Sequence, residues 1–188
     1  MRTLQHIEEE SIEVLVDPTM LLDSKEWEKV SKKPKQIDKL KNKKYILNYF
    51  LGELTSDNKK IIEKFAKKND CEIINILDKN DPFYKTGPSE FLYLEENAFL
   101  ICTDSFHSSV FSILFNRPFL IFERKDKFLS MNSRLDTLLS KFDLENRKFS
   151  KKEITNKDLK YDYTKAYKTL EKERKKSKDF LKKALEIE

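Results

Sequence analysis

Apolar residues along this chain alternate between short continuous runs and helical spacings. Continuous runs of strand length occupy residues 45–51, 71–76, 99–102 and 118–122. Elsewhere apolar positions recur every three or four residues, which predicts helices over 56–69, 87–98, 105–116, 131–142 and 161–187. Buried strands separated by helices are typical of a parallel sheet with right-handed crossovers. The pattern therefore predicts an α/β fold, a Rossmann-like parallel sheet flanked by helices, with a long charged C-terminal helix.

The residues before the first apolar run indicate a junction. Residues 11–16 alternate in polarity and predict a strand, which Asp17 and the proline after it would end. A short helix over 24–30 and a polar linker over 31–44 follow. Asp17 has two interpretations at this point, as hinge geometry or as part of the lining of a cleft.

The stretch 99–122, FLICTDSFHSSVFSILFNRPFLIF, is the most informative part of the chain. It reads as strand, helix, strand, and small polar residues lie where the first strand ends. In open α/β sheets, ligands bind outside the carboxyl ends of the strands. The sequence therefore places a candidate site at Thr103, Asp104, Ser105 and His107.

His107 is the best candidate for acid–base chemistry. If Asp104 or Ser105 caps the following helix, His107 lies in its first turn, where the N–H groups and the helix dipole attract anions. An imidazole that is not already protonated can take a proton from a hydroxyl group and later return it. Asp104 would either orient His107 or only cap the helix. The alternative for His107 itself is a structural histidine bonded to a neighbouring carbonyl.

The two glycines of the chain, Gly52 and Gly87, each begin a loop at the same predicted edge of the sheet. Glycine allows backbone angles and close approaches that other residues resist, so both positions are candidates for ligand contact. Ordinary turn chemistry explains them equally well. Glu90 follows Gly87 by three residues, which fits a helix cap, a contact to ligand hydroxyls or a second acid–base group.

Composition narrows the class of protein. The 38 Lys and Arg against 33 Asp and Glu give a formal net charge of +5, and the lysines lack the interleaved aromatic residues of a nucleic-acid platform. No apolar stretch is long enough to cross a bilayer, so we expect a cytoplasmic protein. The two cysteines fit buried thiols, and no metal-ligand spacing or glycine-rich nucleotide motif occurs, so we expect no metal and no nicotinamide cofactor.

Five motifs in order give the chain a family resemblance. They are DPTMLL at Asp17, YILNYFLG at Tyr45, GPSEFL at Gly87, TDSFHSSVFSILFNRPF at Thr103, and Arg134-Leu135 with Leu138-Leu139. Over residues 17–147 this series resembles the polysaccharide pyruvyl transferase family. The resemblance implies a domain like the carboxy-terminal half of a GT-B fold, in which two Rossmann-like domains face each other across a cleft.

The resemblance also implies a reaction. Family members transfer the pyruvyl group of phosphoenolpyruvate to sugar hydroxyls of a cell-surface polysaccharide or its precursor, so phosphoenolpyruvate and a saccharide are the expected partners and peripheral membrane contact is compatible. His107, Glu90 and Asp104 become the catalytic candidates. Arg134 becomes the matched cation for the anionic donor, with Arg124 and Lys127 as weaker candidates. The remaining substrate-binding candidates are Thr103, Ser105, Gly52, Gly87 and Asp17.

Two departures from the family pattern affect these expectations. Many members have arginine where this chain has Ser105, so another cation must take its place. The resemblance also predicts that residues 1–20 are the remnant of an amino-terminal domain or a linker, that 21–158 form the Rossmann-like domain, and that 159–188 form the charged helix. A missing amino-terminal domain or a second copy would then complete the cleft.

Two other functions stay open from the sequence. One is a catalytically silent binding module that needs a partner domain, and the other is a GT-B-type glycosyltransferase that uses a sugar nucleotide. The terminal helix is relevant to the binding module, which needs a partner. Its apolar stripe is interrupted by Arg174 and Ser177. We expect it to dock only partly on the body or to contact a second copy.

Overall fold

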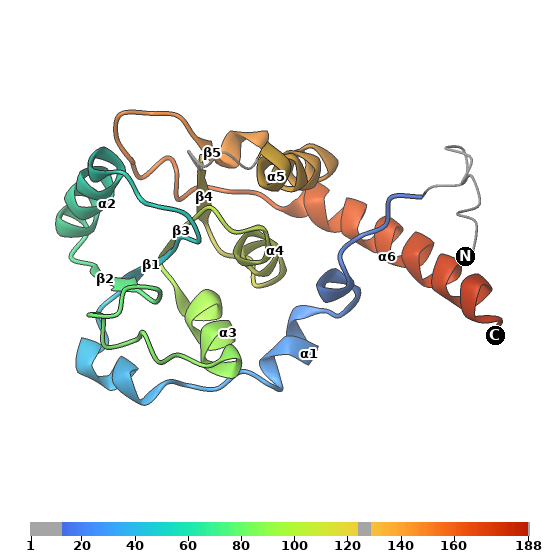
Figure 1. Cartoon of the computed structure of the whole chain (residues 1–188), viewed down its shortest axis with the longest axis horizontal. Coiled ribbons are helices and arrows are strands. Elements are labelled where there is room, and N and C mark those ends of the chain that lie inside the picture. The colour runs from blue at the N-terminus through green and yellow to red at the C-terminus, as the bar shows by residue number, and fades with distance from the viewer. Residues whose placement is uncertain (1–12, 124–128, 188) are drawn as a thin grey trace, which may run out of the picture.

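The computed structural model describes residues 13–123 and 129–187, which form a five-stranded sheet with helices on both faces (Figure 1). The strands are β1 (Tyr45–Tyr49), β2 (Glu72–Asn75), β3 (Leu100–Thr103), β4 (Phe119–Phe122) and β5 (Lys148–Phe149). The α-helices are α1 (Ser24–Glu28), α2 (Ser56–Lys68), α3 (Pro88–Asn97), α4 (Phe106–Leu114), α5 (Leu129–Phe142) and α6 (Thr164–Leu185). Three 3-10 helices complete the fold, η2 (Pro18–Leu21), η3 (Lys35–Leu40) and η4 (Glu145–Arg147).

The sheet has the order β2-β1-β3-β4-β5, and every neighbouring pair is parallel. Leu47 of β1 pairs with Ile74 on one side and with Ile101 on the other, and all three are buried. A parallel sheet covered on both faces requires continuous apolar strands, which is the pattern the sequence contains. The predicted α/β fold with a parallel sheet and a long C-terminal helix is confirmed.

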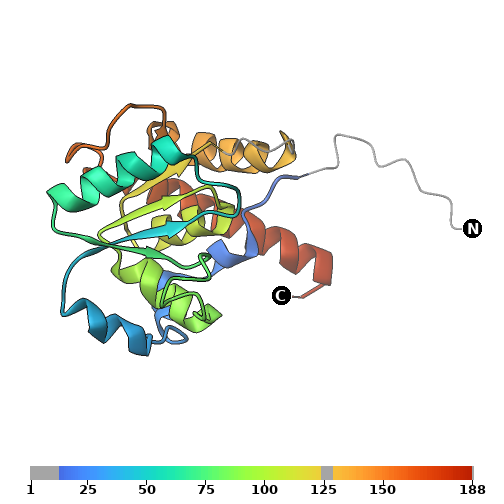
Figure 2. The ribbon, with the colours of Figure 1, turned by 60° about the vertical axis from the view of Figure 1, so that its left-hand side comes forward.

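Two apolar clusters separate the two faces of the sheet. On one face, side chains from α3, α4, α5 and α6 pack against Leu47, Ile101 and Phe119. On the other, α2 and the segment after β5 cover Ile46 and Leu100. Figure 2 shows α2 above the sheet and α3 below it. The alternation of inward side chains along each strand therefore produces a three-layer body.

Two strand predictions differ from the structure. β5 was not predicted, because it has only two residues and one is the exposed Lys148. The strand predicted over 11–16 is wrong where it can be seen: residues 13–17 have no regular structure, and residues 11–12 lie outside the described residues. Instead of pairing with a strand, the backbone N–H of Val16 donates to Ser177 Oγ at 3.3 Å.

Short polar side chains begin and end the helices. Asp23, Thr55 and Ser105 accept hydrogen bonds from backbone N–H groups at the starts of α1, α2 and α4. Asp70 and Asn116, which follow α2 and α4, adopt left-handed backbone angles, and no glycine has a positive φ. Asn and Asp tolerate this conformation better than other non-glycine residues. The chain therefore ends its helices with so few glycines because Asp and Asn take the positions that glycine usually fills.

α6 docks on the body through its first half. The hydroxyls of Tyr161, Tyr163 and Tyr167 donate to the carbonyls of Asn116, Arg117 and Ile113, at 2.7, 2.7 and 2.8 Å, and so fix the start of α6 to the end of α4. Further along α6, Arg174 donates to the carbonyls of Met20 and Leu22. Arg174 and Ser177, which interrupt the apolar stripe, thus hold residues 13–22 against α6. We call residues 13–22 the linker from here on.

The apolar residues of α6 beyond Ser177 are exposed, as expected for a helix that docks only partly. Ala166, Leu170 and Ser177 are buried, whereas Phe180, Leu181 and Leu185 are exposed. None of the helices in the described ranges is both long and apolar enough to cross a bilayer.

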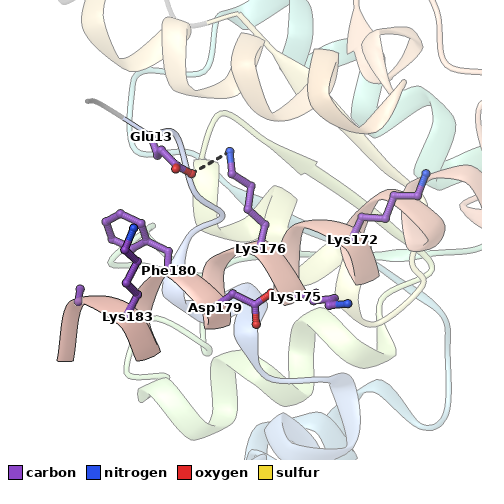
Figure 3. Close-up of a pocket in the computed structure, with 8 residues that line it drawn as sticks. Glu13, Lys172, Lys175, Lys176, Asp179, Phe180 and Lys183 are labelled. Atoms are coloured by element: carbon purple, nitrogen blue, oxygen red, sulfur yellow. Dashed lines mark ion pairs between the residues drawn. The ribbon is translucent and has the colours of Figure 1, made fainter. Parts of the chain in front are cut away.

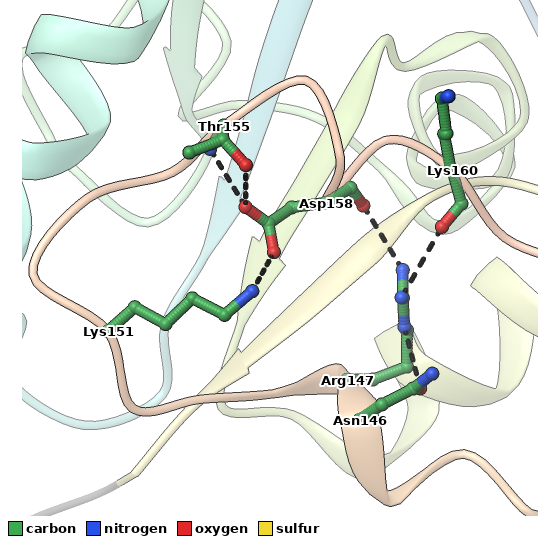
Figure 4. Close-up of polar contacts among 6 residues, drawn as sticks. All are labelled: Asn146, Arg147, Lys151, Thr155, Asp158 and Lys160. Atoms are coloured by element: carbon green, nitrogen blue, oxygen red, sulfur yellow. Dashed lines mark hydrogen bonds and ion pairs between the residues drawn. The ribbon is translucent and has the colours of Figure 1, made fainter.

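Arg147 and Asp158 form a buried polar cluster that holds together the loop after β5 (Figure 4). Arg147 donates to the carbonyls of Asp158 and Lys160. The Asp158 carboxylate accepts from Lys151 Nζ at 2.5 Å, and from the backbone N–H of Thr155 at 2.8 Å and its hydroxyl at 2.9 Å. Burial opposes ionisation of Asp158, but these hydrogen bonds outweigh it and lower the pKa of the carboxyl below its ordinary value.

Candidate functional site

The predicted polar segment lies at the topological switch point of the sheet. β1 and β3 are neighbours, and the connections from β1 to β2 and from β2 to β3 pass over opposite faces through α2 and α3. Ligands of such sheets bind outside the carboxyl ends of the two strands at this point. Residues 103–107 lie at that edge, at the end of β3 and the start of α4, which confirms their predicted place in a parallel sheet.

Thr103 and Ser105 use their polar groups inside the protein. Thr103 Oγ1 donates to the carbonyl of Tyr49 at 2.6 Å and accepts from the N–H of Ser105 at 2.9 Å. Ser105 is the cap of α4, and its Oγ accepts from the N–H of Ser108 at 3.5 Å. Both residues are buried. They connect β1, β3 and α4 and so set the position of the first turn of α4.

Asp104 joins the two strands at the switch point. Its carboxylate oxygens accept from the N–H groups of Leu51 and Gly52, each at 2.7 Å. The prediction that Asp104 caps α4 is wrong, because Ser105 has that role. Neighbouring backbone N–H groups at this edge commonly hold a ligand anion. Here an internal carboxylate engages them, so an external anion needs other donors.

Gly87 and Glu90 form the start of α3. The N–H of Gly87 donates to Glu90 Oε2 at 3.0 Å, which is the capping arrangement foreseen as one interpretation of Glu90. A β-carbon on Gly87 would meet only Glu90 Oε2, at 3.9 Å. Neither Gly87 nor Gly52 has a positive φ. Neither position therefore uses the backbone angles that only glycine favours, and the predicted ligand contact at both positions stays a prediction.

Three sequence-predicted residues from distant parts of the chain meet beside the first turn of α4. Asp17 Oδ2 lies 3.6 Å from His107 Nε2 and 3.7 Å from the Arg134 guanidinium. The other oxygen, Asp17 Oδ1, accepts from the N–H of Thr19 at 3.0 Å and from its hydroxyl at 2.7 Å. Asp17 is thus held by η2, and one oxygen faces the two cationic or potentially cationic side chains. The carboxylate predicted to orient His107 was Asp104, but the one that pairs with it here is Asp17.

The side chains of Asp17, His107 and Arg134 differ in their exposure to solvent. The side chains of His107 and Arg134 are 51% and 48% exposed, whereas that of Asp17 is 14% exposed. The Arg134 guanidinium also lies over the ring of Phe106, 4.2 Å from its centre, which is a cation–π contact. The carboxylate is therefore fixed and largely dry, while the imidazole and guanidinium can reach a ligand.

A pocket of about 400 Å³ opens beside this group, between the linker and α5. Its lining includes Asp17, Phe106 and Arg134, together with the apolar side chains of Val16, Met20 and Leu138. Lys141 also lines it and is paired with Glu173 of α6 at 2.7 Å. An acidic ligand that enters would meet the Arg134 guanidinium and apolar surface. The weaker cation candidates Arg124 and Lys127 lie outside the described residues.

Glu95 is a buried carboxyl that the sequence interpretation missed. It lies on α3 with no exposed surface, and Ser108 Oγ of α4 donates to its Oε1 at 2.5 Å. Its Oε2 has no hydrogen-bond partner among the residues that the structure describes. Burial raises the pKa of Glu95 to about 8, although the bond from Ser108 acts in the opposite direction. Its position, three residues after Leu92 and three before Ala98 on the inward face of α3, was the available signal.

Other chemistry-bearing side chains do not gather into a site. In the ranges the structure describes, no three His, Cys, Asp or Glu residues are grouped as metal ligands are. Cys71 and Cys102 are free. Burial raises the pKa of both thiols, most strongly that of Cys102, so neither forms a reactive thiolate readily.

Comparison with known protein families gives a match over most of the chain. The family model described as polysaccharide pyruvyl transferase matches residues 2–126, which include β1 to β4, Asp17 and His107. Arg134 lies beyond the matched residues. Searches among curated proteins and solved structures gave no significant match.

Proposed function

Because the chain belongs to the polysaccharide pyruvyl transferase family, we propose that it transfers the pyruvyl group of phosphoenolpyruvate to sugar hydroxyls. The acceptor would be a cell-surface polysaccharide or its precursor. The observation that carries this proposal is the meeting of Asp17, His107 and Arg134 beside a pocket that Asp17 and Arg134 line. This group contains a proton carrier, a carboxylate that orients it and a cation for an acidic donor.

The reaction defines what the site must do. When two hydroxyls of one sugar attack carbon 2 of phosphoenolpyruvate, two new C–O bonds form and the bond from carbon 2 to the phosphate oxygen breaks. One hydroxyl proton goes to the methylene carbon, which becomes a methyl group, and the other leaves with the phosphate. The product is a cyclic ketal. The site must therefore move protons and hold a donor that carries both a carboxylate and a phosphate.

His107 is proposed to carry the protons. Its exposed imidazole would accept a proton from the attacking hydroxyl and pass it to the methylene carbon or to the departing phosphate. While the proton is on the ring, the Asp17 carboxylate 3.6 Å away stabilises the added positive charge. Because Asp17 Oδ1 is held by Thr19, this stabilising charge stays in place throughout the reaction.

Arg134 is proposed to bind the anionic donor. A guanidinium forms paired hydrogen bonds with carboxylates and phosphates, and stacking on Phe106 fixes its plane. Arg134 would supply the positive charge that many family members have at the position of Ser105. In this arrangement the donor would lie between His107 and Arg134, and Arg134 and Phe106 line the neighbouring pocket.

The second wall of the cleft is proposed to come from elsewhere. His107 and Arg134 are half exposed on the surface of this body, and a reaction that must exclude water needs a cover over them. A domain of the GT-B amino-terminal kind, or a second copy, would supply that cover and the acceptor site. The chain by itself is then expected to bind the donor and to turn over slowly or not at all.

The two exposed residues make the proposal testable. In the assembly that contains both walls, phosphate release is measured against phosphoenolpyruvate concentration for His107→Ala and Arg134→Ala. His107→Ala should lower turnover by about 10²- to 10⁴-fold with little change in KM, because positioned acid–base groups act in the transition state. Arg134→Ala should mainly raise KM, because the donor is held by the cation before and during the reaction.

Titration of phosphoenolpyruvate into the chain alone gives an independent readout, in which Arg134→Ala should weaken binding and His107→Ala should not. Lys60→Ala, an exposed change on α2, is the matched control. Unchanged turnover in His107→Ala would remove the acid–base assignment. Hydrolysis of a nucleotide sugar in place of phosphoenolpyruvate would point to a glycosyltransferase, and binding of neither donor to a silent module.

A further inference from the structure

The far end of α6 presents an apolar face that the body does not cover. The inward line of Ala166, Leu170 and Ser177 continues to Phe180 and Leu181, three and four residues after Ser177, and then to Leu185, four residues after Leu181. The first three residues are buried, whereas Phe180 and Leu185 are 40% and 64% exposed. Leu181 and Ile187 are exposed on the same part of the chain. About three turns of amphipathic helix therefore extend past the sheet.

Lysines border this apolar face on both sides. Lys176 and Lys183 lie beside Phe180 and line an open pocket of about 870 Å³, where Lys176 also pairs with Glu13 at 3.1 Å (Figure 3). On the opposite edge, Lys178 and Lys182 follow the same spacing and line a second hollow. Long lysine side chains can extend from the edges of an apolar face while their stems stay in contact with it.

The charge of this end is predominantly positive. Between positions 172 and 187 the sequence has six lysines and one arginine against three acidic residues. Arg174 is used for the carbonyls of Met20 and Leu22, so the cations that remain at the surface are lysines. Lysine ammonium groups are point charges without a fixed geometry, whereas defined carboxylates of a protein partner are matched better by arginine.

We propose that the end of α6, residues 176–187, docks on an anionic lipid surface. An apolar face of Phe and Leu bordered by lysines is the pattern of helices that lie in a membrane interface, with the apolar side chains inserted and the lysines at the phosphates. A second copy of the chain fits less well, because pairing these faces would bring the two sets of lysines together. The proposal does not depend on the reaction assigned to His107.

Vesicle sedimentation tests this proposal with the full chain and no substrate. The chain should sediment with vesicles of phosphatidylcholine mixed with phosphatidylglycerol, should not do so with phosphatidylcholine alone, and should be released as salt is raised. The double variant Phe180→Ser, Leu185→Ser should bind roughly tenfold more weakly, and so should Lys183→Glu.

Two matched variants control for exposure and charge elsewhere. Leu77→Ser changes a leucine that is 46% exposed in the loop after β2, and Lys60→Glu reverses an exposed charge on α2. Both should bind like the unmodified chain, with far-UV circular dichroism showing that all variants are folded. The proposal is overturned if the unmodified chain does not bind the anionic vesicles, or if the controls lose binding equally. It is also overturned if sedimentation equilibrium shows a dimer that Phe180→Ser abolishes, because the face then belongs to a second copy.

Discussion

Two polar clusters of this molecule contain similar residues but differ in their contact distances and in their burial. Around Asp158 and Arg147, most contacts are 2.5 to 3.1 Å and the side chains are buried, so most of the donors and acceptors there are satisfied by one another. Around Asp17, the distances to His107 and Arg134 are 3.6 and 3.7 Å and both partners are half exposed. Short buried contacts stabilise a single conformation. Longer contacts at an open surface leave the imidazole and guanidinium able to bind something else.

Glu95 provides the sharpest test of this contrast, because it is buried but only half partnered. Below about pH 4.5 it is protonated in both the folded and the unfolded chain. As the pH rises the unfolded chain releases this proton, while the folded chain keeps it up to about pH 8. The free energy of unfolding should therefore fall by about 1.4 kcal/mol per pH unit across this window.

Replacement of Glu95 by Gln should remove that loss, since an amide does not ionise. At pH 8 the variant should be more stable than the original chain by on the order of 3–5 kcal/mol, with little difference near pH 4. Urea unfolding at several pH values measures this. Glu63→Gln, an exposed change on α2, should leave the pH dependence unaltered. A parallel pair of stability curves for Glu95→Gln and the original chain would show that the carboxyl is ionised in the fold.

Arg147→Ala should give the next largest effect. It leaves the carbonyls of Asp158 and Lys160 without their buried donor, which should lower the free energy of unfolding by about 3 kcal/mol. Donor binding should stay unchanged in the folded fraction. Thermal unfolding and phosphoenolpyruvate titration of the same variant separate the two outcomes. A selective loss of donor binding with no loss of stability would contradict the structural role of this group.

Asp17→Asn should have the smallest energetic effect of the three variants. It should act on turnover and leave the fold unchanged. Asn keeps the oxygen that accepts from Thr19, so η2 should stay capped. Turnover should fall by about 10- to 100-fold, because the imidazolium loses its stabilising charge. Asp23→Asn, the same change at the cap of α1, is the control and should leave turnover unchanged.

The fold could be predicted from the sequence because most of its elements are defined locally. Apolar runs identified β1 to β4, and the predicted starts of α2 and α4 lie within one residue of the observed ones. β5 escaped because pairing with β4, and not its composition, defines it. The strand predicted before Asp17 failed for the converse reason, since its alternation had no strand to pair with and Ser177 took its N–H.

The candidate site could be predicted only in part, because its contacts are long-range. His107 and its place after β3 follow from one continuous stretch of sequence. Its carboxylate partner does not, because Asp17 is 90 positions away and Asp104 was the nearer candidate on the chain. Asp104 instead engages the N–H groups of Leu51 and Gly52. Glu95 left a local signal, a charged residue on an inward helix face, which the apolar pattern around it obscured.

The hydrogen bonds from Arg174 and Ser177 to residues 16–22 impose an order on the folding of the chain during synthesis. Residues 16 to 22 leave the ribosome more than 150 positions before the side chains that anchor Val16, Met20 and Leu22. The sheet can assemble before α6 exists, whereas the segment that carries Asp17 gains these anchors only once Arg174 and Ser177 have been synthesised. A nascent chain that is stalled before Arg174 would therefore contain the sheet but lack the bonds that anchor the segment around Asp17 to α6.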